Sequence, residues 1–233
     1  MIWLQEPFDF AAGAILNFRK PLGKSSFWVV KQVRRMINTK VGHAGTLDPF
    51  AGGVLLLCTG KATKQVSQFM DLEKVYSGEI QLGIVTNTDD VTGTITNQSD
   101  VPVFTFDEIN KICQEFTGDI YQIPPMFSAK KVKGKRLYKS ARAGLIVERK
   151  PSLVHIEEIR VLSYKAPVIS IEVRCSKGTY IRSLARDIGE KAGCGAHLKT
   201  LERTKIGNFK VKDSLTLEKF RLLLEKAGVL KDD

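Results

Sequence analysis

The apolar residues of this chain follow helical spacing in some segments and strict alternation in others. After Ser25, a residue type that caps helices, Val29 or Val30, Val33 and Ile37 fall on one face of an expected helix. Similar spacing predicts a helix over 60–72, with Ala62, Val66, Phe69 and Met70 on its apolar face, and another over 216–227. Two more helices are expected, one beginning at the capping-box pair Thr105 and Glu108 and one capped by Thr179.

Strict alternation of apolar and polar residues predicts strands. Tyr76, Gly78, Ile80 and Leu82 share one parity, and residues 168–175 alternate in a way that predicts one buried face. Helical and strand-like segments are intermixed along the 233 residues. The pattern therefore predicts an α+β protein, and the chain is long enough to bury a sizeable core.

Composition narrows the class of protein. The four cysteines have no Cys-x-x-Cys spacing and only three histidines are present, which argues against a zinc site or a disulfide framework. The N-terminal segment carries Glu6 and Asp9 where a signal peptide would be basic, and no apolar run approaches the thickness of a bilayer. We therefore expect a cytoplasmic protein without a membrane segment or a metal.

The positive charge is concentrated in two blocks. The chain has a formal net charge of +11, of which residues 19–40 carry +7 and residues 130–150 carry +8, so the remainder is −4. The second block lies within residues 124–150, which open with a Pro-Pro break, turn at Gly134 and contain a short helical pattern ending at Gly144. We interpret 124–150 as an inserted basic arm, and the two blocks as surfaces for a polyanion such as a nucleic acid. Solvated surface charge is the competing interpretation.

The stretch VGHAGTLDPFAGGVLLL, residues 41–57, holds one aspartate among four glycines. Pro49 disfavours helical angles at Asp48, and the glycines permit close approach of a backbone or a ligand. Asp48 could act on a substrate, or it could only accept hydrogen bonds in a turn. His43 alone fits a loop anchor as well as a catalyst.

Two further groups could carry chemistry. Arg182 falls in the first turn after a strand-to-helix junction, where it would meet a substrate phosphate, a carboxylate such as Asp48, or a surface acid. Tyr76 enters a strand with the parity of core residues, so it could be a core residue or could stack on a base. The residues alone leave these choices open.

Together the motifs resemble the TruB family of tRNA pseudouridine synthases over roughly residues 13 to 215. Seven segments resemble motifs of the family and occur in the family's order: LNFRKPLGKSSFWVVKQVRR, GHAGTLDPFAGGVL, KVYSGEIQLG, TNTDDVTG, IPPMFSAKKVKGKRLYKSARAG, SKGTYIRSLARDIG and GCGAHLKTLERTKIG. The resemblance implies a pseudouridine synthase fold with a central mixed, mainly antiparallel sheet flanked by helices. It also implies one catalytic domain over 1–233 with 124–150 as an RNA-binding thumb, and without the PUA domain that many relatives carry.

The same resemblance implies an isomerase, an intramolecular transferase that converts uridine 55 in the T-loop of tRNA to pseudouridine without a cofactor. Asp48 would be the essential carboxylate, attacking C1′ or abstracting a ribose proton, with Arg182 orienting it and Tyr76 stacking on the flipped base. Substrate-binding residues would be His43, Lys20, Asp90, Lys130, Lys131, Tyr180 and Leu201, with Asp90 as a partner of Arg182.

The expected partner is the T-arm of tRNA, bound by a monomer. One alternative is a non-catalytic RNA-binding protein or tRNA chaperone with the same charge pattern. A second is a nucleoside hydrolase or base glycosylase, although these enzymes usually need a metal or a second reacting carboxylate.

Overall fold

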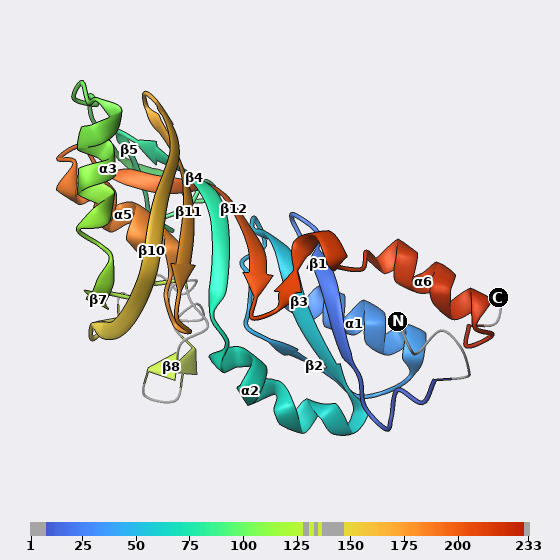
Figure 1. Ribbon diagram of the computed structural model, residues 1–233. Helices are drawn as coiled ribbons and strands as arrows, with labels where there is room; N and C mark the ends of the chain where they lie inside the picture. The colour runs from blue at the N-terminus through green and yellow to red at the C-terminus, as the bar shows by residue number, and fades with distance from the viewer. Residues whose placement is uncertain (1–7, 128–130, 133–134, 137–146, 231–233) are drawn as a thin grey trace. The chain divides into compact units, whose positions relative to one another are not determined.

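A computed structural model of the protein (Figure 1) describes residues 8–127, 131–132, 135–136 and 147–230. The chain divides into two compact units. Unit 1 combines Met1–Leu72 with Glu202–Asp233, and unit 2 is Glu73–Leu201. The strand β12 (Ala196–Ile206) contributes its first half to unit 2 and its second half to unit 1. Within the described residues, no helix is long and apolar enough to span a membrane.

Unit 1 is a small sheet with helices packed against it. Its strand β3 pairs antiparallel with β1 and β2, and it pairs parallel with β12 at Gly52 and Gly53. The elements are β1 (Ile15–Lys20), α1 (Ser26–Ile37), β2 (Val41–Ala44), β3 (Gly52–Thr59), the 3-10 helix η2 (Gly60–Gln65), α2 (Val66–Asp71), β13 (Phe209–Lys210), the 3-10 helix η3 (Val211–Asp213) and α6 (Leu217–Lys226).

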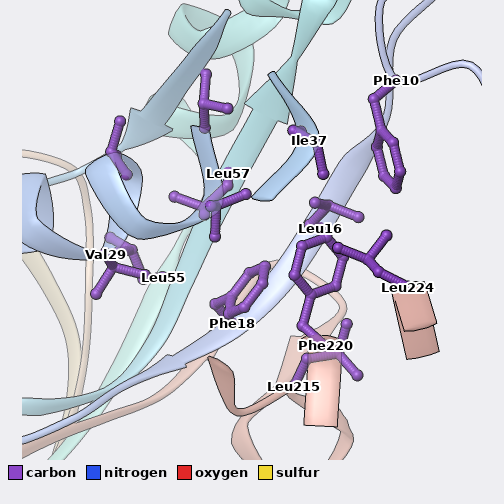
Figure 2. Close-up of a cluster of buried hydrophobic side chains, with 13 residues drawn as sticks. Phe10, Leu16, Phe18, Val29, Ile37, Leu55, Leu57, Leu215, Phe220 and Leu224 are labelled. Carbon is purple, nitrogen blue, oxygen red and sulfur yellow. The ribbon is translucent and has the colours of Figure 1, made fainter. Parts of the chain in front are cut away.

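The core of unit 1 joins β1 and β3 to α1 and α6. Figure 2 shows Phe18 and Phe220 facing each other within this cluster, and their rings pack edge to face with centroids 5.1 Å apart. Phe18 and Phe220 are completely buried, as are Val29 and Val33 of α1. Because this packing anchors β1 and the start of α1, it also fixes the segments that lie beside the Asp48 loop.

Unit 2 is a sheet with strand order β12-β4-β11-β10-β7, in which β4, β11, β10 and β7 pair antiparallel. Its helix α3 packs on β10 and on α5. The mixed, mainly antiparallel sheets and their helices confirm the expected fold class. The elements are β4 (Lys74–Leu82), the hairpin β5 (Ile84–Thr86) and β6 (Ile95–Gln98), α3 (Phe106–Gln114), β7 (Gly118–Gln122), the short pair β8 (Lys131–Val132) and β9 (Lys135–Arg136), β10 (Ser152–Lys165), β11 (Val168–Cys175) and α5 (Ile181–Lys191).

The alternation and capping patterns predicted these elements well. In β11 every second residue from Ile169 to Cys175 is buried, and Thr105 and Glu108 form the expected capping box of α3. Ser25 caps α1 and Thr216 caps α6 through their side chains, as their residue types indicate.

Two expectations were wrong. Residues 60–65 form a 3-10 helix and α2 begins only at Val66; on α2, Met70 is exposed, whereas Val66 and Phe69 pack against the core. Thr179 does not cap α5. Its hydroxyl donates to the Ser176 carbonyl at 3.1 Å, and Tyr180 occupies the N-cap position of α5 without a side-chain capping hydrogen bond. The expected turn at Gly134 and the helical pattern before Gly144 lie outside the described residues.

Candidate active-site elements

Asp48 lies in the loop that connects β2 to β3 in unit 1. Gly45 opens this loop with a φ of +85°, a left-handed conformation that favours glycine. The Asp48 carbonyl accepts a hydrogen bond from the Ala51 backbone at 3.1 Å, which closes a turn around Pro49. The Asp48 residue is half-buried, so the loop presents it neither inside the core nor fully in solvent.

A buried serine fixes the middle of this loop. The Ser26 hydroxyl accepts a hydrogen bond from the Leu47 N–H at 2.8 Å and donates to the Leu47 carbonyl at 3.1 Å. Ser26 is the first residue of α1 and is 1% exposed. Both backbone groups of the residue before Asp48 are therefore bound to the start of a helix.

A buried lysine fixes the end of the loop. The Lys20 ammonium donates to the carbonyls of Pro21, Lys24 and Pro49, and Lys20 is 1% exposed. Burial lowers the pKa of Lys20 to about 8; the negative charge of Asp48 opposes this shift and the positive charge of Arg203 adds to it. These three bonds use all the donors of the ammonium group on the loop and the adjacent turn.

A buried arginine fixes the beginning of the loop. The Arg203 Nη2 donates to the Gly45 carbonyl at 3.1 Å and its Nε donates to the Val54 carbonyl at 2.8 Å. Arg203 belongs to β12 and is 1% exposed. Gly53 allows the backbone of β12 to pair closely with β3, because a Cβ at Gly53 would lie 2.3 Å from the Arg203 carbonyl oxygen.

His43 lies on β2 opposite Leu57 and is half-buried. Burial lowers the pKa of His43; a hydrogen bond with the Gly45 backbone opposes this shift, and the nearby Arg203 guanidinium adds to it. The net lowering favours the neutral imidazole, which can bind a polar group without adding charge.

In unit 2, Arg182 is almost completely buried in the first turn of α5. Its Nη1 lies 3.4 Å from the Asp90 carboxylate and donates to the Thr88 carbonyl at 3.0 Å, while its Nη2 donates to the Phe127 carbonyl at 2.8 Å. The contact with Asp90 that the sequence implied is present. Asp90 is itself held by Thr88 and Thr92, whose hydroxyls donate to its Oδ1.

Hydrogen bonds fix Tyr180 in unit 2, and strand parity places Tyr76 relative to Leu201. Gln122, which is 1% exposed, accepts from the Tyr180 N–H at 2.8 Å and donates to the Tyr180 carbonyl at 3.0 Å. A Cβ at Gly78 would lie 3.4 Å from a methyl carbon of Leu201, and Tyr76 shares the parity of Gly78 on β4. Tyr76 and Leu201 therefore belong to the same face of this sheet.

The structure thus places Lys20 near Asp48 and His43 near Arg203 in unit 1, and it brings Asp90, Tyr180 and Arg182 together at the start of α5 in unit 2. Lys130 lies outside the described residues, and of Lys131 only the backbone, in β8, is described. Among the described residues, no group of three His, Cys, Asp or Glu is placed to hold a metal ion. Sequence reasoning missed Ser26, Gln122 and Arg203 as supports of these elements.

Two protein-family models match consecutive parts of this chain. Residues 34–181 match the TruB family pseudouridylate synthase N-terminal domain, and residues 182–231 match the tRNA pseudouridylate synthase B C-terminal domain.

Individual relatives agree with this result. A tRNA pseudouridine synthase B of Clostridium kluyveri is 46% identical over 93% of this chain and 74% of its own length. One of Bacteroides fragilis is 46% identical over 95% of this chain and 98% of its own.

Solved structures share the fold. A Cbf5-Nop10-Gar1 complex matches 95% of this chain with a TM-score of 0.72 and 30% identity, and this chain spans 58% of the matched chain. An H/ACA RNP bound to a substrate RNA containing 2′-deoxyuridine matches 94% of this chain with a TM-score of 0.68 and 28% identity, over 56% of the matched chain.

Proposed function

Since this chain belongs to the TruB family of tRNA pseudouridine synthases, we propose that it isomerises uridine 55 in the T-loop of tRNA, with Asp48 as the essential carboxylate. The reaction breaks the N1–C1′ bond, rotates the uracil, joins C5 to C1′ and removes the proton from C5. Asp48 serves either as the nucleophile at C1′ or as the base that removes a ribose proton.

The observation that carries this proposal is the way in which the Asp48 loop is held. A plain turn would not need a buried serine, a buried lysine and a buried arginine from three elements to fix its backbone. Burying such groups costs free energy unless they are fully bonded. A fixed carboxylate is what an attack on a sugar carbon requires, because catalysis depends on the geometry of the reacting atoms.

The groups of unit 2 take supporting roles in the proposal. Arg182, held by Asp90 and by backbone carbonyls, provides a fixed cation that orients the reacting carboxylate. Tyr76 stacks on the everted base, with Tyr180 and Leu201 as further walls of the base pocket. His43, kept neutral, supports the extruded nucleotide, and Lys20 acts on substrate through the loop that it binds.

A uridine stacked in a folded T-loop cannot reach a carboxylate in a protein, so the nucleotide must flip out at a cost of a few kcal/mol. Basic surface can offset this cost by binding phosphates. In the block 19–40, six of the seven basic residues are exposed, and only Lys20 is buried. Of the six, Arg19 pairs with Glu202. The thumb 124–150 would supply the second basic surface.

We expect a monomer that acts in the cytoplasm, where tRNA is modified. The four cysteines are buried and free, as suits a reducing compartment. Size-exclusion chromatography with light scattering would give the mass of the chain as 26.0 kDa if it is a monomer and twice that value if it is a dimer.

The deciding experiment replaces the carboxylate with its amide. Asp48→Asn should bind transcribed tRNA as the wild-type protein does but release no tritium from C5-labelled uridine. Asp107→Asn is the matched control, because Asp107 is an exposed residue of α3. It should release tritium at the wild-type rate.

Two outcomes would favour the competing functions. If the wild-type protein binds tRNA but releases no tritium, the protein is an RNA-binding module or a chaperone. If the reaction yields free uracil instead of an isomerised nucleotide, the protein is a glycosylase or a hydrolase. A transcript in which uridine 55 is replaced by cytidine tests the position, because tritium release should then be abolished.

A second experiment tests the thumb through the salt dependence of binding. Neutral replacements of Lys130, Lys131, Lys133 and Lys135 should weaken tRNA binding and lower the slope of log affinity against log salt by about 1 for each phosphate that is no longer neutralised. The matched control neutralises four lysines outside both basic blocks: Lys111, Lys165, Lys219 and Lys226. An unchanged slope in the first variant would refute the thumb assignment.

A further inference from the structure

We propose that Arg203 is a positioning residue for the Asp48 loop: its guanidinium fixes the backbone at Gly45 and thereby limits where the Asp48 carboxylate can lie. The inference rests on the proposed function, since the position of Asp48 affects a rate only if Asp48 acts on the substrate. Arg203 itself does not touch the reacting atoms in this proposal. It acts through the three residues that separate Gly45 from Pro49.

The guanidinium continues the connection between β2 and β3 beyond their last paired residues, Ala44 and Leu56. Its Nε binds the Val54 carbonyl within β3, and its Nη2 binds the Gly45 carbonyl at the start of the loop, so one rigid planar group sets the distance between them. A lysine at this residue would keep the charge, but it has no pair of donors with this fixed geometry.

The burial of Arg203 is costly for a residue that only fills space. It is 1% exposed and among the largest fully buried side chains, and none of the ion pairs among the described residues involves it. Replacement of buried charged groups by apolar residues of similar volume is often neutral or stabilising. The stability of the sheet therefore does not explain an arginine here, whereas two carbonyls that must be held at a set spacing do.

The position of Gly45 shows how closely the loop follows the guanidinium. A Cβ at Gly45 would lie 3.3 Å from the Arg203 Nη1, and Gly45 has the left-handed φ of +85°. With Leu47 held by Ser26 and Pro49 by Lys20, Gly45 is the third residue of the loop that a buried side chain holds. Its release lets Asp48 shift, and a misplacement of about 1 Å can cost about 100-fold in rate.

The test compares Arg203→Lys with the wild-type protein in single-turnover pseudouridine formation at saturating tRNA, together with tRNA affinity and the melting temperature. We expect the rate to fall by about 100-fold while the affinity for tRNA stays at the wild-type value. Arg221→Lys is the matched control, because Arg221 lies on α6 of the same unit with a 65% exposed side chain. It should change none of the three quantities.

A double substitution separates positioning from a loss of stability. Gly45→Ala should lower the same rate, because its Cβ would lie 3.3 Å from Nη1 at a φ of +85° and displace the carbonyl that Arg203 binds. The Arg203→Lys, Gly45→Ala protein should then be little slower than the slower single variant, because both changes act on the same hydrogen bond. Rates that fall in proportion to the folded fraction, or losses that multiply in the double variant, would overturn the proposal. A wild-type protein that forms no pseudouridine would instead overturn the proposed function.

Discussion

The bond between Ser26 and Leu47 allows a quantitative prediction. The substitution Ser26→Ala removes one hydroxyl and leaves the side chain otherwise of similar size. In the folded protein this hydroxyl serves two buried backbone groups, the Leu47 N–H at 2.8 Å and the Leu47 carbonyl at 3.1 Å. Ser26 and Leu47 are 1% and 3% exposed, so water has little access to either group.

The expected loss of stability follows from the N–H and the carbonyl of Leu47, which would both be left without a partner. Each buried donor or acceptor that loses its partner costs about 1–3 kcal/mol. Because a small relaxation of the loop can recover part of one bond, we expect a loss of about 2–4 kcal/mol in the free energy of unfolding. For a chain of this length, each kcal/mol lowers the melting temperature by about 2–4 °C, so the variant should melt roughly 5–15 °C lower.

Urea unfolding followed by tryptophan fluorescence measures this free energy, and single-turnover pseudouridine formation measures the effect on the neighbouring Asp48. Ser67→Ala, at an exposed residue of α2, is the matched control and should change stability by less than about 0.5 kcal/mol. If Ser26→Ala unfolds at the same urea concentration as Ser67→Ala, the hydroxyl does not hold the loop and the reasoning is wrong.

Three further predictions concern other parts of the chain. Thr105→Ala should destabilise the protein by about 1 kcal/mol in urea, because the Thr105 hydroxyl caps α3; an unchanged midpoint would contradict this role. His155 should titrate above its ordinary pKa in an NMR experiment, because Asp119 and Glu157 bind its ring, and Asp119→Asn should lower that pKa; the stabilisation should be present below the ordinary pKa and be lost as the pH rises through the raised one. Gly53→Ala should fold poorly, as judged by soluble yield and circular dichroism, because its Cβ would lie 2.3 Å from the Arg203 carbonyl and its φ is +101°, whereas Gly118→Ala, which has a φ of +92° but no neighbour within 4 Å, should fold.

The parts of the fold that depend on local pattern could be predicted from the sequence. The alternation in 168–175 predicted which face of β11 is buried, and Thr105 with Glu108 predicted where α3 begins. These signals work because side-chain direction repeats every two residues in a strand and caps bind backbone groups three residues away. The pattern failed at 60–72, where the chain forms a 3-10 helix before α2 and Met70 becomes exposed.

The candidate site was predictable only where its chemistry is carried by local motifs. Asp48 stands out because a proline and glycines surround it, and Arg182 because it follows a strand-to-helix junction. Ser26 and Arg203 carry no such signal, since each acts on a backbone group that is 21 or 158 residues away in the chain. A contact at that separation depends on the tertiary fold, which periodicity and capping do not specify.

The arrangement of these contacts explains how a glycine-rich loop can hold a reacting group. Glycines allow Gly45 its left-handed turn and let Arg203 approach, but they also give the unfolded chain more freedom, so the loop needs compensating bonds. The bonds fall on alternate residues, at Gly45, Leu47 and Pro49, and each comes from a buried side chain on a different element. Asp48 lies between two of these fixed residues, so its backbone cannot move without breaking a buried hydrogen bond, while its half-buried side chain keeps access to a substrate. Substitutions at the three supporting side chains should therefore slow the reaction more than they weaken tRNA binding, because they change the position of Asp48 and leave the basic surface intact.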